Sequence, residues 1–273
     1  MLKQRVITAL VLASVFISTI LLADHRWVVV LFALVLFVAS YELLTLTLKT
    51  DFWPGMIAAL LFAILFWATN DSIDLRINYY QSLVGVFAWA LIAGFLLIYQ
   101  FSGNWSLSAR CFQLVMGVSL LWICVHGLVF IHQYFQQGGW ILLYLLTLVW
   151  VADIGAYFSG RRFGKHKLAP GISPGKTWEG VAGGVTLNLL WMGIVFQISN
   201  GWGIELWQFI LIGFASSLIS VVGDLYESIL KREAAVKDSG KLLPGHGGVL
   251  DRIDSVIAAT PVFVSGLYAV GAV

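Results

Sequence analysis

The sequence is poor in charge, cysteine and proline for its length. Of its 273 residues only 11% are charged, two are cysteines and five are prolines, whereas 60% are hydrophobic and the mean hydropathy is +0.90. A soluble domain of this size does not tolerate so little charge, because its surface would be apolar. The composition therefore excludes a soluble globular protein and predicts an integral membrane protein that spans the bilayer several times.

The two cysteines give no sign of a metal site. Cys111 and Cys124 lie in or beside one apolar segment, without zinc-ligand spacing and without acidic neighbours. We therefore expect both to be lipid-buried thiols that take no part in the chemistry of the protein.

Nine apolar runs are candidates for transmembrane helices, and they predict an all-α, polytopic membrane protein. They cover residues 6–23, 27–48, 55–69, 83–101, 112–132, 140–159, 181–199, 206–222 and 256–272. The first run could be a signal peptide, but no small-x-small cleavage pattern closes it, so we expect a retained first helix. We expect one membrane domain over residues 1–273, with an N-terminal helical bundle at 1–135 and a catalytic core at 140–273.

The basic residues lie almost entirely on one side of this nine-span layout. The amino terminus falls on the same side as the loops after spans two, four, six and eight. That side holds all of the 16 lysines and arginines except Arg26 and Arg76. Because cytoplasmic loops are enriched in lysine and arginine, we predict that the amino terminus and the two large polar segments face the cytoplasm.

Residues 223–254 form the most highly charged stretch of the chain. They mix acidic and basic side chains around a glycine-rich turn at 244–248. Asp224 leaves the eighth span and Asp251 begins the ninth, so both carboxylates can converge on one hard cation, and Asp254 shares the helical face of Asp251. Carboxylate and water ligands select Mg²⁺ or Mn²⁺ that bridges to substrate phosphates. The three aspartates are therefore predicted metal ligands, and a salt-bridged cytoplasmic hairpin is the alternative.

A second polar segment, residues 153–180, begins inside an apolar helix. An acid at this depth costs about 2.5–3.5 kcal/mol on insertion scales, so Asp153 is a functional candidate unless it pairs with a neighbouring helix. Tyr157 lies at i+4 from Asp153 and shares its face. The basic run 161–167 that follows would, by itself, be a topogenic patch at the cytoplasmic rim.

Within that segment, residues 173–177 (SPGKT) offer a glycine, a lysine and a hydroxyl in the manner of a phosphate-binding loop. The leading glycine of a P-loop is missing and no soluble strand precedes the run, so we reject that motif. At the start of the seventh helix, Lys176 and Thr177 nevertheless combine free backbone N–H groups, the positive end of the helix dipole and an ammonium group. This combination suits a bound phosphate.

The two polar segments together resemble a known family. Residues 228–232 (SILKR), 237–238 (KD) and 244–254 (PGHGGVLDRID) are similar, without departure, to the signature of the phosphatidate cytidylyltransferases, the CDP-diacylglycerol synthases. Residues 153–180 resemble the other cytoplasmic motif of that family, so the resemblance covers most of residues 150–260. It implies an enzyme that converts CTP and phosphatidic acid to CDP-diacylglycerol and pyrophosphate, with Mg²⁺, alone or with a second cation, as cofactor.

The same resemblance implies a set of site residues. Asp224 and Asp251 become the metal-binding acids, and cationic side chains surround the phosphates. The expected catalytic residues are Asp224, Lys231, Lys237 and Asp251. The expected substrate-binding residues are Asp153, Tyr157, Ser173, Lys176, Thr177, Arg232, Asp238, His246, Gly247, Gly248 and Arg252.

The expected partners are CTP, phosphatidic acid and membrane lipid, with no nucleic acid. The family is known as dimeric, which implies a homodimer, and the site is expected at the cytoplasmic face of the cell inner membrane. A transporter of ions or lipids is the rival from another class, because nine spans with buried acids could carry cations. The sequence shows no inverted repeat, and its polar residues gather at one face rather than at the midplane. A phosphotransferase that acts on a prenyl phosphate is a further alternative.

Overall fold

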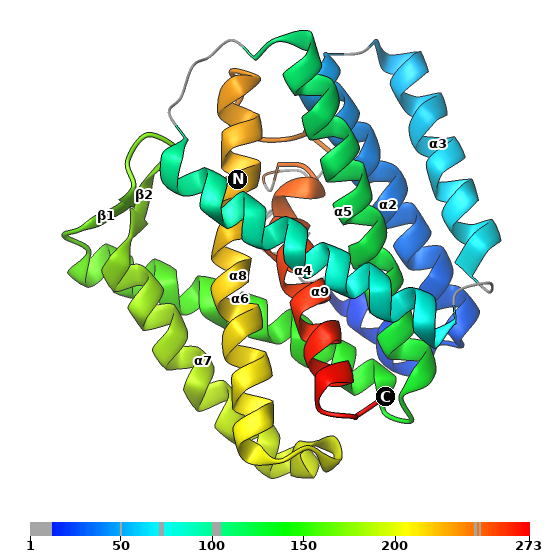
Figure 1. Cartoon of the computed structure of the whole chain (residues 1–273), viewed down its shortest axis with the longest axis vertical. Helices are drawn as coiled ribbons and strands as arrows, with labels where there is room; N and C mark the ends of the chain where they lie inside the picture. The colour runs from blue at the N-terminus through cyan, green and yellow to red at the C-terminus, as the bar shows by residue number, and fades with distance from the viewer. Residues whose placement is uncertain (1–12, 50, 71–73, 100–104, 243–244, 246) are drawn as a thin grey trace. The chain divides into compact units, whose positions relative to one another are not determined.

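The computed structural model describes residues 13–49, 51–70, 74–99, 105–242, 245 and 247–273, and these residues are mainly helical (Figure 1). After a short apolar helix at Ala13–Leu22 come α2 (His25–Leu48), α3 (Phe52–Thr69), α4 (Leu75–Ile98), α5 (Leu107–Tyr134) and α6 (Gly138–Phe163). Two antiparallel strands follow, β1 (Lys167–Ala169) and β2 (Ser173–Thr177). The chain continues with α7 (Trp178–Ser199), the 3-10 helix η2 (Asn200–Gly203), α8 (Leu206–Glu233) and α9 (Leu250–Ala269).

Within the described residues, seven helices, α2 to α8, are long and apolar enough to cross a membrane. This confirms the expected all-α, multi-pass membrane protein. Most helices extend beyond the predicted apolar runs, and α4 and α8 do so by the most residues. Helix α4 begins at Leu75, where Oδ1 of Asp74 accepts the N–H of Ile77 at 2.8 Å and satisfies one of the donors at the start of the helix. Helix α8 continues through the charged residues as far as Glu233.

The chain divides into two compact units. Unit 1 consists of Met1–Asn78, Ser102–Leu142 and Ile229–Asp254, and unit 2 consists of Tyr79–Phe101, Leu143–Ser228 and Ser255–Val273. The charged segment is divided as a result: Asp224 belongs to unit 2, whereas Lys231 and Asp251 belong to unit 1.

In unit 1, α2 packs between α3 and α5 (Figure 1). The core side of α2 carries Phe32, Leu36 and Leu43, each at most 2% exposed. Gly117 of α5 faces this side, and a Cβ at that position would lie 2.8 Å from Cδ2 of Leu43. The missing side chain therefore lets α5 approach α2 closely. Cys124 of α5 is buried in protein, whereas Cys111 near the start of the same helix is exposed.

In unit 2, glycines bring α6 and α7 almost into backbone contact. A Cβ at Gly155 of α6 would lie 2.8 Å from the carbonyl oxygen of Gly183 and 2.9 Å from Cα of Gly184 on α7. Small residues at such crossings let helix backbones approach closely in membranes. The close crossing fixes the face of α6 that carries Asp153 and Tyr157 relative to the amino-terminal end of α7.

Helix α9 contains Pro261, and a tryptophan compensates for it. Proline has no N–H, so in a regular helix the carbonyl four residues earlier, that of Ile257, loses its helical donor. The indole N–H of Trp89 on α4, a side chain only 1% exposed, donates to this carbonyl at 3.2 Å. The pairing ties α4 to α9 within unit 2, and the hydroxyls of Ser82 and Ser265, 2.9 Å apart, join the same two helices.

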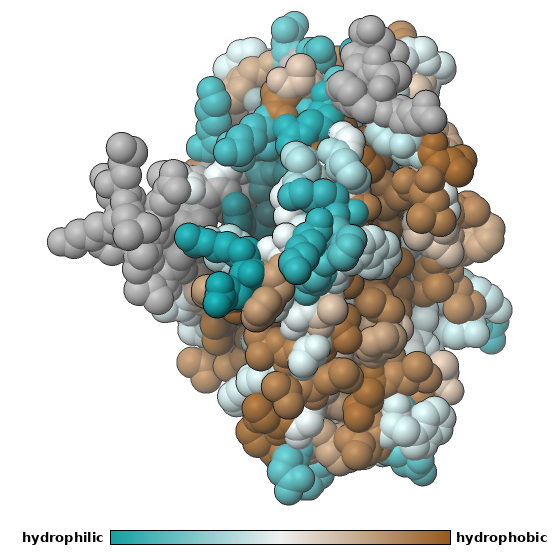
Figure 2. All heavy atoms as spheres, turned by 90° about the vertical axis from the view of Figure 1, so that its left-hand side faces the viewer, coloured by the Kyte–Doolittle hydropathy of each residue, from teal (hydrophilic) through white to brown (hydrophobic). Residues whose placement is uncertain are grey.

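Large apolar side chains remain exposed along the spanning helices. On α7, Leu190 is 62% and Ile198 is 79% exposed, and Trp67 near the end of α3 is 62% exposed. Figure 2 shows a broad hydrophobic surface beside a group of hydrophilic side chains on one face. In a bilayer such a surface contacts lipid acyl chains rather than water, so it needs few charged side chains.

Candidate functional site

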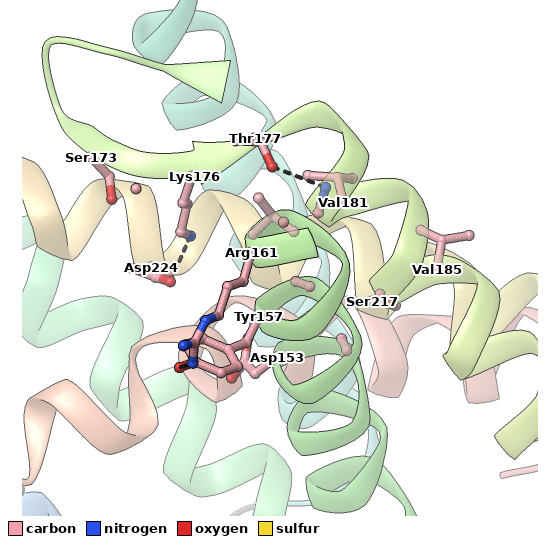
Figure 3. A pocket seen from close by; sticks show the side chains of 17 residues that line it. Asp153, Tyr157, Arg161, Ser173, Lys176, Thr177, Val181, Val185, Ser217 and Asp224 are labelled. Carbon is pink, nitrogen blue, oxygen red and sulfur yellow. Dashed lines mark hydrogen bonds and ion pairs between the residues drawn. The ribbon is translucent and has the colours of Figure 1, made fainter. Parts of the chain in front are cut away.

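Unit 2 contains a cavity of about 510 Å³, named here the α6–α8 cavity, which is lined by α6, β2, α7 and α8 (Figure 3). Its walls combine small apolar residues with polar ones. The polar lining residues are Asp153, Tyr157, Arg161, Ser173, Lys176, Thr177, Ser217 and Asp224. Six of these eight were expected as site residues from the sequence, and the structure brings them together around one space.

An ion pair crosses the α6–α8 cavity. Nζ of Lys176 lies 2.5 Å from Oδ2 of Asp224, and the two side chains are 23% and 31% exposed (Figure 3). Lys176 comes from β2, and Asp224 comes from α8. The pair therefore presents a cation and an anion side by side in a partly shielded site, where charges interact more strongly than in open water.

The strand β2 positions Lys176, although the sequence predicted the start of a helix there. β2 pairs antiparallel with β1, with Thr177 opposite Lys167, Ser173 opposite Ala169 and an irregularity between these two pairs. The N–H of Trp178 donates to the carbonyl of His166 at 3.0 Å. Helix α7 begins only after Thr177, whose buried hydroxyl accepts the N–H of Gly180 at 3.1 Å. Thr177 thus caps the helix, and Lys176 projects from the strand just before that cap.

Three polar side chains on α6 face the same cavity. Asp153, Tyr157 and Arg161 follow one another at i, i+4 and i+8, and Nη1 of Arg161 donates to the hydroxyl of Tyr157 at 3.2 Å (Figure 3). Sequence reasoning took Arg161 only as part of a basic rim. The signal that could have placed it in the site is the same helical spacing that linked Asp153 to Tyr157.

In unit 1, Asp251 is held by four donors. Its Oδ1 lies 2.7 Å from Nζ of Lys231, and its Oδ2 accepts the N–H and the hydroxyl of Ser239, each at 2.9 Å, and the N–H of Gly248 at 2.8 Å. The side chains of Asp251 and Lys231 are only 6% and 15% exposed. Oδ2 therefore holds the loop before α9 in place by hydrogen bonds, and Oδ1 faces Lys231.

These contacts determine the protonation state of Asp251. Burial alone would raise the pKa of this carboxyl, but the hydrogen bonds from Lys231, Gly248 and Ser239, together with the positive charge of Lys231, bring the pKa below its ordinary value of 3.8. Asp251 is therefore a carboxylate at neutral pH.

Sequence reasoning missed a second acid in unit 1, Glu42 on α2. It is 3% exposed, and it accepts the N–H groups of Val249 and Leu250 and the hydroxyl of Ser239. A single acid in an otherwise apolar helix is the signal that singled out Asp153, and the same signal applied to Glu42.

The remaining expected residues belong to the end of α8, to the segment between α8 and α9, and to the start of α9. Lys237, Asp238, Arg232 and Arg252 are exposed, and Asp254 is half-buried. Gly247 has φ +83°, and a Cβ there would lie 2.6 Å from Oδ2 of Asp251, so both the backbone conformation and the space require glycine. Gly248 is buried, and His246, which was expected to bind substrate, lies outside the described residues.

No cluster of three or more histidine, cysteine, aspartate or glutamate side chains that could hold a metal ion occurs in the part of the chain that the structure describes. Instead, each of the two central carboxylates is paired with a lysine, Asp224 with Lys176 and Asp251 with Lys231. The metal roles of Asp224, Asp251 and Asp254 therefore stay predictions.

Comparisons with known proteins cover nearly the whole chain. A family model described as the cytidylyltransferase family matches residues 3–270. The chain is 39% identical over 272 residues to the phosphatidate cytidylyltransferase of Pseudomonas aeruginosa, a match that covers 99% of this chain and 98% of the relative. It is 37% identical to the phosphatidate cytidylyltransferase of Haemophilus influenzae, covering 96% and 97%, and 33% identical to that of Bacillus subtilis, covering 95% of each.

Proposed function

The chain belongs to the cytidylyltransferase family, and from this membership we propose that it transfers CMP from CTP to phosphatidic acid, giving CDP-diacylglycerol and pyrophosphate. The observation that carries the proposal is the full-length similarity to three relatives that bear the name phosphatidate cytidylyltransferase. The two lysine–aspartate pairs supply the charges that this chemistry needs.

The reaction requires charge neutralisation more than proton transfer. The phosphate of phosphatidic acid is already an oxyanion at neutral pH, so it attacks the α-phosphorus of CTP without a general base. A new P–O bond forms to the phosphatidate oxygen, the bond from the α-phosphorus to the bridging oxygen breaks, and pyrophosphate leaves with the electron pair. Two anions must be held together throughout, and lysine and arginine side chains stabilise the charge that moves onto pyrophosphate.

The lysine–aspartate pairs suit this task. Phosphate oxygens compete with Asp224 for Lys176 and with Asp251 for Lys231, since both lysines carry a compact charge with three donors. When a lysine turns to phosphate, the aspartate oxygen that it leaves becomes available to a cation. Substrate arrival and cation binding would then support each other.

The donor set fits Mg²⁺ that arrives with its substrate. This ion is usually held by one or two carboxylates together with substrate phosphates and water, rather than by a cage made only of protein ligands. Asp224, Asp251 and Asp254 would hold it, alone or with a second cation, and the bound ion supplies charge neutralisation on the phosphates. Among the described residues, Asp224 and Asp251 each lie beside a lysine that can also bind substrate phosphate.

The location follows from the distribution of charge. We propose that the chain is a multi-pass protein of the cell inner membrane, with its active site facing the cytoplasm, because lysine and arginine gather on that side of the nine-span layout. The walls of the α6–α8 cavity support a site for an amphiphilic substrate, since Ala152, Val181 and Val185 line it beside Lys176 and Asp224. A homodimer is part of the same proposal.

An assay of the purified chain in mixed micelles tests the proposal. With CTP, phosphatidic acid and Mg²⁺, we expect pyrophosphate and CDP-diacylglycerol in equal amounts, loss of both products with EDTA, and recovery when Mg²⁺ is added in excess. Absence of product together with ion flux in liposomes would support a transporter instead. Product formed only from a prenyl phosphate would support a different phosphotransferase.

A further inference from the structure

Glu42 reaches from α2 to a loop about 200 positions later in the chain, and both of its carboxylate oxygens are occupied there. Oε1 accepts the N–H of Val249 at 3.1 Å, and Oε2 accepts the N–H of Leu250 at 2.8 Å. The hydroxyl of Ser239 lies 3.2 Å from the same Oε2. All of these residues belong to unit 1. A buried acid of α2 thus receives the donors at the very start of α9.

The loop is shaped to admit this carboxylate. A Cβ on Gly240 would collide with Oε1 of Glu42, and the three nearest atoms all belong to the Glu42 side chain. A Cβ on Gly248 would collide with the hydroxyl of Ser239 and with Oε2 of Glu42. Neither glycine has a positive φ, so the backbone conformation does not require glycine at these two positions. Glycine is required there because a side chain would not fit beside Glu42.

Glu42 and Asp251 are linked through Ser239. The Ser239 hydroxyl lies 2.9 Å from Oδ2 of Asp251 and can donate its one proton to either carboxylate. Asp251 is the second residue of α9, directly after Leu250, whose N–H donates to Glu42. The carboxylate of Glu42 therefore fixes the backbone that carries Asp251 and thereby the direction of its Oδ1 toward Lys231.

We propose that Glu42 is a positioning residue of the cytidylyl-transfer site, which acts by holding the start of α9 so that Asp251 and Lys231 meet in one geometry. The expected effect on catalysis rests on the proposed function. The hold of Glu42 on the start of α9 does not depend on that function. Three donors converge on two oxygens, and a carboxylate can accept them all. A glutamine keeps one carbonyl oxygen and turns an N–H₂ group toward a backbone or hydroxyl donor, so it cannot replace the acid.

The substitution Glu42→Gln tests this directly. We expect kcat to fall by about 10–100-fold, the range seen when groups that orient ligands are removed. The change in KM for CTP should be smaller, because both oxygens of Glu42 already have protein donors. In the same protein, hydrogen exchange at the amides of Val249 and Leu250 should accelerate. The matched control is Ser40→Ala, since Ser40 is another buried polar residue of α2 and its hydroxyl bonds only within its own helix, to the carbonyl of Phe37.

A second variant keeps the charge and moves the carboxylate. Gly240→Ala places a methyl group against Glu42, so it should reproduce the faster exchange at Val249 and Leu250 and the lower kcat. Gly171→Ala is its control, because nothing lies within 4 Å of the added carbon there. The double variant Glu42→Gln, Gly240→Ala should lose less activity than the product of the two single losses, because both changes act on one contact.

The outcomes separate this proposal from the proposed function. If wild-type chain shows no cytidylyl transfer, the function is wrong, while exchange at Val249 and Leu250 still tests the hold of Glu42. Unchanged exchange in both Glu42→Gln and Gly240→Ala would overturn the proposal, as would faster exchange with wild-type kcat. If Glu42→Gln fails to fold, wild-type exchange and activity in Gly240→Ala would overturn it in the same way.

Discussion

The two carboxylate oxygens of Asp251 have different partners. Oδ2 accepts the N–H groups of Ser239 and Gly248 and competes with Glu42 for the hydroxyl proton of Ser239, and Oδ1 meets Lys231. Asp224 likewise meets Lys176. From the sequence, the mixture of acids and bases could be predicted, but the partner of each acid could not. The pairs lie 20 and 48 positions apart in the chain, and only tertiary packing decides which lysine reaches which aspartate.

The substitution Asp251→Asn should abolish turnover while the protein remains folded and inserted. The asparagine carbonyl can still accept the donors of Ser239 and Gly248, but the charge that faces Lys231 and a bound cation is gone. Loss of such an electrostatic interaction lowers kcat by about 100-fold or more. Pyrophosphate release from CTP measures the effect, and Asp24→Asn, at an exposed residue whose side chain makes no cap hydrogen bond, is the control. Activity near that of the wild type would refute the role of Asp251 in the metal site.

The cysteines provide a second test at this scale. Neither thiol lines the α6–α8 cavity. The combined substitutions Cys111→Ala and Cys124→Ala should therefore change kcat/KM by less than about threefold, which corresponds to less than 1 kcal/mol in transition-state stabilisation. The same micelle assay checks this. A large loss of activity in a folded double variant would show that a thiol takes part in the chemistry.

At the scale of elements, the helices could be predicted because long apolar runs leave few alternatives in a membrane. The hairpin β1–β2 could not, since Ser173–Thr177 contains Pro174 and Gly175, which disfavour strands. Contacts between the residues that flank the hairpin stabilise it instead. The carboxylate of Glu179 accepts the N–H groups of Lys165 and His166, and its Oε1 lies 2.6 Å from Nδ1 of His166. The start of α4 at Leu75 was missed because Asp74, its cap, precedes several polar residues.

The hydrogen bond from Trp89 to the carbonyl of Ile257 should contribute to the stability of unit 2. Trp89→Phe leaves that carbonyl without its donor, which should lower the free energy of unfolding by about 1–3 kcal/mol. Pro261→Ala supplies a helical N–H to the same carbonyl, so Trp89→Phe should be less damaging in that background. Thermal unfolding in detergent measures both, with Trp67→Phe at an exposed position as the control for loss of indole. Equal losses in the two backgrounds would show that Trp89 contributes only by packing.

At the scale of the whole molecule, composition alone identified a multi-pass membrane protein, and the motifs identified its family. The division into two units was not visible in the sequence, because α4, α6, α8 and α9 each run through residues of both units without a break in composition. The contacts of Glu42 could not be predicted for a related reason. Its partners lie at 239, 249 and 250, and no local pattern joins a helix near the amino terminus to a loop near the carboxyl terminus.

The fate of a heavy-oxygen label tests the central claim, attack of a phosphatidate oxygen on the α-phosphorus of CTP, most directly. Phosphatidic acid labelled in its free phosphate oxygens is incubated with the purified chain, CTP and Mg²⁺, and the products are analysed by mass spectrometry. If a phosphatidate oxygen attacks, CDP-diacylglycerol retains all of the label, with one labelled oxygen bridging its two phosphorus atoms, and pyrophosphate carries none. Label in pyrophosphate, or pyrophosphate formed without CDP-diacylglycerol, would contradict it.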